Sequence, residues 1–159
     1  MNLLTINAAK SNFFDRLTVI TAAGQARVRV FSRFGSHVRR RAKSSIRKRK
    51  KSSKPGQAPS SHVGTLRRLI FFSYDRNRNS VVMGPTLINH PTGAPEILEY
   101  GGNTVVDDVR WVSGPKYGNR RQRIATTKRV KIAARPYMGP AFKAELPGLP
   151  AMWKDSIRK

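Results

Sequence analysis

The stretch Val28-Arg-Val-Phe-Ser-Arg-Phe-Gly-Ser-His-Val-Arg-Arg-Arg-Ala-Lys-Ser-Ser-Ile46 decides the fold, because its apolar residues recur every three or four positions. An α-helix has 3.6 residues per turn, so this spacing places them along one side of a helix. The pattern continues toward the N-terminus, and we predict a helix over residues 8–47. Its apolar stripe consists of Leu17, Ile20, Gly24, Val28, Phe31, Gly35, Val38, Ala42 and Ile46.

Two local features work against an unbroken helix. Gly24 and Gly35 each cost about 1 kcal/mol relative to Ala, which favours a bend or break at either position. Residues 27–31 alternate between basic and apolar side chains, as a strand would. The basic residues fall mostly off the stripe, so the helix either packs on its own domain with a solvated basic face or forms an arm on a neighbouring subunit. They are Arg27, Arg33, Arg40, Arg41, Lys43 and Arg47.

The charge of the chain is strongly positive and uneven. Its 159 residues include 32 Lys and Arg against 8 Asp and Glu, for a formal net charge of +24. Sixteen basic residues and no acidic one lie between Arg16 and Tyr74. A protein with this charge repels itself, so we expect its partner to be a polyanion or an acidic protein surface. The length allows one domain, or one domain with an arm.

The absence of several features narrows the class of protein. There is no Cys, which excludes disulfides, thiolate metal sites and Cys nucleophiles. No apolar run approaches the ~20 residues of a membrane span. The first ten residues lack the basic and then apolar layout of a secretory signal. We therefore expect a soluble intracellular protein, or one that stays inside an assembly, with no membrane partner.

Residues 48–61 form the second part of the chain, after an N-terminal part at 1–47. They have no apolar periodicity, and we predict a flexible basic loop. Such a loop can bind phosphates by charge alone, serve as a localisation-like tract, or simply be solvated. It has no aromatic residue on which a base could stack. The basic residues expected to contact a subunit or DNA are Arg39, Arg40, Arg41, Lys43, Arg47, Lys48, Arg49, Lys50, Lys51 and Lys54.

Residues 62–159 read as an α+β body. Residues 70–74 and 80–84 are rich in β-formers and flank a polar Asp/Asn turn, which predicts a β-hairpin. A further strand is expected within 123–134. Short helical pieces are expected at 63–70, 94–100, 141–146 and 151–157, and residues 103–122 look like a turn-rich insert. We predict a small, mainly antiparallel β-sheet flanked by the long basic N-terminal helix and a C-terminal helix.

A search for catalytic residues finds no convincing group. His37, His62 and His90 have no second His or carboxylate at metal-ligand spacing. The adjacent acids Asp107 and Asp108 can do acid–base work or hold a hard cation, but structural ion pairs or subunit contacts are favoured. The same interpretation applies to the carboxylates of Glu96 and Glu99. The aromatic residues Trp111 and Tyr117 are either interface anchors or core residues. We expect no enzymatic activity, no metal and no cofactor.

Three segments nevertheless form a recognisable succession. They are Pro59-Ser-Ser-His-Val-Gly-Thr-Leu-Arg-Arg-Leu-Ile70, Ala94-Pro-Glu-Ile-Leu-Glu-Tyr-Gly-Gly102 and Ala134-Arg-Pro-Tyr-Met-Gly-Pro-Ala-Phe142. Their order resembles the tail-completion or head–tail joining (neck) proteins of tailed double-stranded DNA phages, which are similar to the minor tail protein Z group. The positions that match the motifs are Gly64, Leu66, Arg67, Glu99, Tyr100, Gly101, Arg135, Pro136, Tyr137, Pro140 and Ala141. Val63 departs from the Thr usual in that family, and the insert at 103–122 is longer.

The resemblance implies a structural protein of the virion, assembled in the host cytoplasm, with no enzymatic activity. It implies a hexameric homo-oligomeric ring that links the tail tube to the head connector. The resemblance implies neighbouring neck and tail-tube proteins as partners. It leaves open whether the protein also makes non-specific contact with DNA in the lumen. The matched residues serve either as folding determinants or as contacts. The alternative from charge alone is a general nucleic-acid-binding protein that uses residues 27–54.

Overall fold

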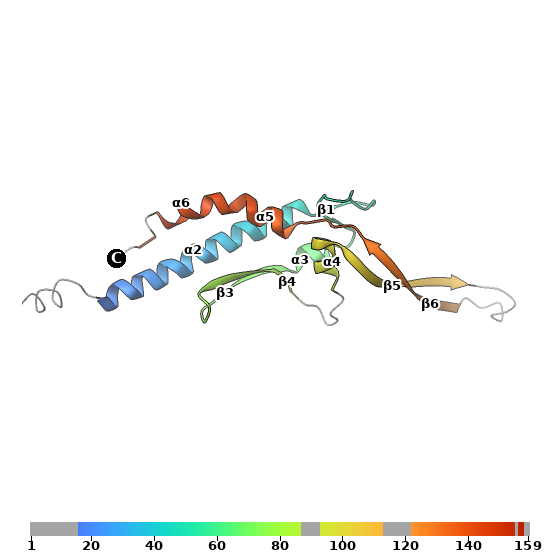
Figure 1. The fold of residues 1–159 in the computed structure, drawn as a ribbon, viewed down its shortest axis with the longest axis horizontal. Helices are drawn as coiled ribbons and strands as arrows, with labels where there is room; N and C mark the ends of the chain where they lie inside the picture. The colour runs from blue at the N-terminus through green and yellow to red at the C-terminus, as the bar shows by residue number, and fades with distance from the viewer. Residues whose placement is uncertain (1–15, 87–92, 113–121, 155, 158–159) are drawn as a thin grey trace, which may run out of the picture.

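A single long helix, α2 (Arg16–Ser45), organises the fold. The computed structural model describes residues 16–86, 93–112, 122–154, 156 and 157, so the expected helix start at residue 8 lies outside the described residues. The helix is continuous through Gly24 and Gly35 and through residues 27–31, so the expected bend, break or strand there is wrong. Figure 1 shows α2 running along one half of an elongated molecule.

Gly35 has a packing role instead of marking a bend. A Cβ atom at this position would lie 2.8 Å from Val81 Cγ2 and 2.9 Å from Phe72 Cδ2. Both distances are shorter than van der Waals contact, so the glycine lets the helix approach the neighbouring hairpin closely. Gly24 has no such neighbour within 4 Å.

The predicted stripe is correct in the second half of α2 and wrong in the first. Gly35, Val38 and Ala42 are buried, as expected, but Leu17 is 77% exposed and Ile20 is also exposed. The buried positions run every four residues instead: Ala26, Val30, Phe34, Val38, Ala42 and Ile46. Residues four apart turn about 40° around a helix axis, so the buried line winds across α2 under elements that cross it.

Two layers pack on α2. On one side lies the antiparallel hairpin of β3 (Ile70–Asp75) and β4 (Ser80–Pro85), and on the other lie α5 (Met138–Glu145) and α6 (Leu149–Trp153). The predicted hairpin is thus confirmed, with Asp75 opposite Ser80. A turn of 3₁₀-helix, η2 (Leu146–Gly148), joins the two C-terminal helices.

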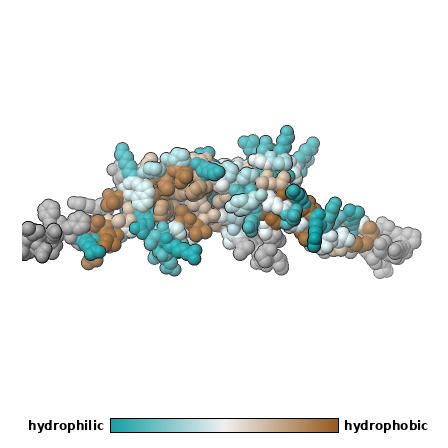
Figure 2. Space-filling model, viewed as in Figure 1, coloured by the Kyte–Doolittle hydropathy of each residue, from teal (hydrophilic) through white to brown (hydrophobic). Residues whose placement is uncertain are grey.

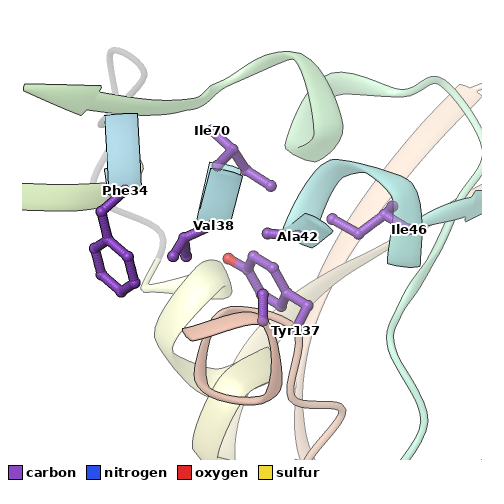
Figure 3. Packing of buried hydrophobic residues seen from close by; sticks show 7 residues of the cluster. Phe34, Val38, Ala42, Ile46, Ile70 and Tyr137 are labelled. Carbon is purple, nitrogen blue, oxygen red and sulfur yellow. The ribbon is translucent and has the colours of Figure 1, made fainter. Parts of the chain in front are cut away.

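The core lies where the three layers meet. Figure 3 shows Val38 and Ala42 of α2 between Ile70 of the hairpin and the ring of Tyr137. The buried residues that form this core cluster are Phe34, Val38, Ala42, Ile46, Ile70, Tyr137 and Ala141. Leu66, expected in the body, is partly buried and packs against this cluster. The sequence positions of these residues span most of the chain, so the core ties the N-terminal helix to the C-terminal one.

The α+β class is confirmed, but its strands do not form one small sheet. Among the described residues they form three separate two-stranded pairs. β1 (Arg47–Lys48) pairs in parallel with β2 (Ser60–Ser61), and β3 pairs with β4. The third pair is β5 (Gly102–Val112) with β6 (Gln122–Ile132), antiparallel, with Gly102 opposite Ile132.

The β5–β6 pair corrects the expectation of a turn-rich insert at 103–122. Residues 103–112 belong to an 11-residue strand, and the strand expected within 123–134 is its partner β6. Residues 113–121 lie outside the described residues. This ribbon extends away from α2 (Figure 1). Most side chains of β5 are exposed and its apolar residues do not alternate regularly with polar ones, so the usual signal of a half-buried strand is missing there.

Two short helices complete the fold. α3 (Thr65–Arg68) follows Gly64, which has φ 87° and precedes the helix without a side-chain cap. α4 (Ala94–Tyr100) confirms the helical piece predicted at 94–100, with Pro95 in its first turn and Gly101 as its C-cap. In the ranges that the structure describes, no helix is both long enough and apolar enough to cross a bilayer.

Candidate functional site

The carboxylate of Glu99, at the end of α4, caps the start of α5. Oε2 accepts hydrogen bonds from the backbone N–H groups of Tyr137 and Met138 at 2.9 and 3.0 Å, and Oε1 accepts one from Gly139 at 2.7 Å. The first N–H groups of a helix have no partner within the helix, and the helix dipole favours an anion there. Among the described residues Glu99 forms no ion pair, so the expectation of one is wrong, and its carboxylate instead holds two motif segments together.

Gly101 brings the same two segments into close approach. Its φ of 77° lies in the left-handed region that favours glycine. A Cβ atom would also lie 3.0 Å from the backbone nitrogen of Ala134. Arg135 continues the junction, because its backbone N–H donates to the carbonyl of Leu98 at 2.6 Å. The second and third motifs therefore form one packed unit, which we call the motif junction (Glu99, Gly101, Arg135 and Tyr137).

Tyr137 anchors this junction in the core, where its side chain is fully buried. Burial, and then the negative charge of Glu99, raise the pKa of Tyr137 to about 12. The phenol is therefore neutral over the physiological pH range. Other positions that match the motifs are on the surface: Tyr100 is 79% exposed, and Arg67 and Pro140 are exposed.

The basic loop is tied to the motif junction. Arg135 Nε donates to the carbonyl of Ser53 at 3.1 Å, and the N–H of Gly56 donates to the carbonyl of Ala134 at 2.8 Å. Ser53 is buried, while the parallel pair of β1 and β2 closes the base of the loop. The cationic residues of the loop point outward and are exposed: Lys48, Arg49, Lys50, Lys51 and Lys54.

The basic residues of α2 divide between two sides of the helix. Arg41 forms an ion pair with Glu145 of α5, and His37 Nδ1 lies 3.8 Å from the same carboxylate. Arg39 instead reaches the hairpin, where its Nε donates to the carbonyl of Ile70 at 2.8 Å. Arg40 and Arg47 are exposed. The ten residues expected as one contact surface are thus not equivalent, because Arg41 is neutralised within the chain.

Arg39 and Lys43 lie on the same side as Phe71 of β3. The Cζ of Arg39 is 5.5 Å and the Nζ of Lys43 is 5.6 Å from the centroid of its ring. Desolvation, followed by the positive charges of Arg39 and Arg67, lowers the pKa of Lys43. The Nζ of Lys43 also lies 3.5 Å from the carbonyl of Arg68 in α3, so the preceding residue of that helix, Arg67, lies on the same side of α2. We call Arg39, Lys43 and Arg67 the cation cluster.

The ribbon exposes apolar side chains on a charged background. Val105 is 58% and Trp111 is 59% exposed, and Val106 and Val109 are exposed as well. Figure 2 shows hydrophobic residues at both ends of the described molecule, among hydrophilic ones. Asp108 pairs with Arg110 at 2.9 Å on β5, whereas Asp107 is exposed. Trp111 is therefore not a core residue, and Tyr117 and His90 lie outside the described residues.

The described residues hold no group of three or more His, Cys, Asp or Glu side chains arranged to bind a metal ion. His62 is exposed beside the loop. Sequence reasoning missed the cap by Glu99 and the place of Arg67 in the cation cluster. Both arise between segments far apart in the chain, so no local spacing signals them.

Comparisons of the chain with protein-family models, with curated proteins and with solved structures find no match.

Proposed function

We propose that this protein is a structural subunit of the neck of a tailed phage, where it forms a hexameric ring that joins the tail tube to the head connector. In this role it makes and breaks no covalent bond. The proposal rests on the three motif segments, two of which pack together in the motif junction. The observation that carries it furthest is the β5–β6 ribbon.

The ribbon is built as an element that needs a partner. A lone two-stranded hairpin is marginally stable in water. Here the two 11-residue strands extend away from the core, and valines on both faces are exposed. Among the described residues no third strand pairs with either outer edge, and a sheet edge can pair with another chain. Packing against a neighbouring subunit satisfies these requirements, and a ring gives every ribbon the same neighbour.

Val105→Ser tests this role of the ribbon. Burying the exposed part of a valine contributes about 1 kcal/mol, so the substitution weakens each subunit contact about fivefold. Val82→Ser is the matched control, because Val82 is a strand residue with 61% exposure on the other hairpin. Native mass spectrometry of the purified full chain at several concentrations measures the ring and the free subunit.

We expect the ring to dissociate at lower dilution in Val105→Ser than in Val82→Ser or the parent protein. Equal behaviour of the two variants would remove the ribbon from the interface. A protein that stays monomeric and binds DNA with nanomolar affinity at physiological salt would instead support the alternative, a general nucleic-acid-binding protein. If this protein were absent from mature virus particles, the proposed role in the neck would be contradicted.

A further inference from the structure

The cation cluster is held in place by packed elements. Arg39 and Lys43 lie one turn apart on the same side of α2, and both lie over the ring of Phe71. The Nε of Arg39 is fixed by the carbonyl of Ile70, and Lys43 Nζ has one long contact of 3.5 Å to the carbonyl of Arg68. The short helix α3 supplies Arg67 beside them.

No carboxylate neutralises these charges within the described part of the chain. The ion pairs there involve Glu145, with Arg41 and His37, and Asp108, with Arg110. Like charges one helical turn apart destabilise a helix. Desolvation is the main cause of the lowered pKa of Lys43, and repulsion by Arg39 and Arg67 adds to it. A bound anion would remove this repulsion. Arg41, on the other side of α2, is already paired with the carboxylate of Glu145.

The cluster also has hydrogen-bond donors to offer. Among the described residues, the terminal guanidinium nitrogens of Arg39 and the whole guanidinium of Arg67 make no hydrogen bond. Lys43 uses at most one of its three N–H donors, in the long contact to Arg68. Guanidinium groups bind phosphate through two parallel N–H donors, and an ammonium adds a point charge. Arg39 and Lys43 lie against the same ring and the charge of Arg67 acts on Lys43 from α3, and cationic groups arranged in this way suit a tetrahedral oxyanion.

We propose that Arg39, Lys43 and Arg67 bind a phosphate group of a nucleic-acid backbone. The charge of the surrounding chain selects this partner over an acidic protein, because residues 16–74 carry sixteen cations and no acid. A duplex presents one negative charge per about 1.7 Å along its axis, which such a long basic segment can follow. The inference stands whether or not the protein forms a ring.

The test compares two doubly substituted full-length proteins of equal charge. Lys43→Gln with Arg67→Gln removes two members of the cluster and keeps the bond of Arg39 to Ile70. Arg76→Gln with Arg78→Gln is the control, in the exposed turn between β3 and β4. Fluorescence anisotropy with a labelled 20-base-pair duplex measures affinity from about 50 to 200 mM salt, the range over which phosphate contacts dominate. Thermal melts confirm that both proteins are folded.

Loss of one phosphate contact reduces the slope of log affinity against log salt by about 0.9. We expect this reduction in the cluster variant and not in the control. Equal slopes in the two variants would overturn the proposal, since only total charge would then matter. Competition gives a second readout: polyphosphate should displace the duplex from the parent protein better than polyglutamate of equal charge. Equal displacement by polyglutamate would assign the site to an acidic protein and would also overturn the proposal.

Discussion

Replacing Glu99 with Ala should destabilise the whole domain, although Glu99 is not part of the hydrophobic core. The substitution removes three hydrogen bonds of 2.7–3.0 Å to the start of α5. A hydrogen bond to a charged group contributes about 1.5–3 kcal/mol, and loss of an N-cap costs about 0.5–2 kcal/mol. Water can reach the freed amides at this half-buried site, so we expect a total loss of about 3 kcal/mol in the free energy of unfolding.

A thermal melt measures this loss directly. For a chain of this length, each kcal/mol lowers Tm by about 2–4 °C, so Glu99→Ala should melt about 6–12 °C below the parent. Glu99→Gln retains one acceptor oxygen, so its Tm should lie between those of the parent and Glu99→Ala. Hydrogen exchange gives a local check, because the amides of Tyr137, Met138 and Gly139 lose their acceptor and should exchange faster in Glu99→Ala.

Glu96→Ala is the control, since Glu96 is exposed and lies in the same short helix. Its loss removes only a favourable charge near the helix N-terminus, worth about 0.3–1 kcal/mol. If Glu99→Ala and Glu96→Ala melt at the same temperature, the cap does not stabilise α5 and the motif junction has been misinterpreted.

The two glycines of α2 should respond to Ala with opposite signs. Gly24→Ala should raise the free energy of unfolding by up to about 1 kcal/mol, because Ala has the higher helix propensity. Gly35→Ala forces a methyl group into Val81 and Phe72 and should lower it by about 1–3 kcal/mol. Urea unfolding measures both changes, and equal changes in the two variants would contradict the close packing at Gly35. Alkaline pH should reveal Tyr137, whose folded pKa of about 12 exceeds its ordinary value of 10. Its contribution is complete below pH 10 and is lost as pH rises to about 12, because the unfolded chain ionises first. The difference in stability between the parent and Tyr137→Phe should therefore change over that interval, and a constant difference would disprove the shift.

The sequence predicts elements whose signals are local. The apolar spacing of Val38, Ala42 and Ile46 identifies the buried side of α2, and the turn between β3 and β4 identifies the hairpin. In the first half of α2 the buried residues are Ala26 and Val30, not the predicted stripe that includes Leu17. Which residues are buried depends on which elements cross the helix. That crossing is set by tertiary packing, which periodicity within one helix does not contain.

The candidate site is harder to predict for the same reason. Arg135 and Tyr137 are singled out by their motif, but the partner that organises them, Glu99, lies 38 residues before Tyr137 in the chain. The cation cluster likewise joins Lys43 to Arg67 across the basic loop. Of the two ribbon strands, β6 is predicted from its sequence, whereas β5 is missed because most of its side chains are exposed and its apolar residues do not alternate regularly.

The position of Tyr137 and Ala141 in the core has a consequence for how the chain is made. During synthesis, α2 emerges before Ile70 of the hairpin and well before Tyr137 and Ala141, which complete its buried side. The helix therefore stays partly uncovered until α5 has been synthesised. A truncated product that lacks α5 should thus expose Phe34 and Val38 and be a substrate for chaperones and proteases.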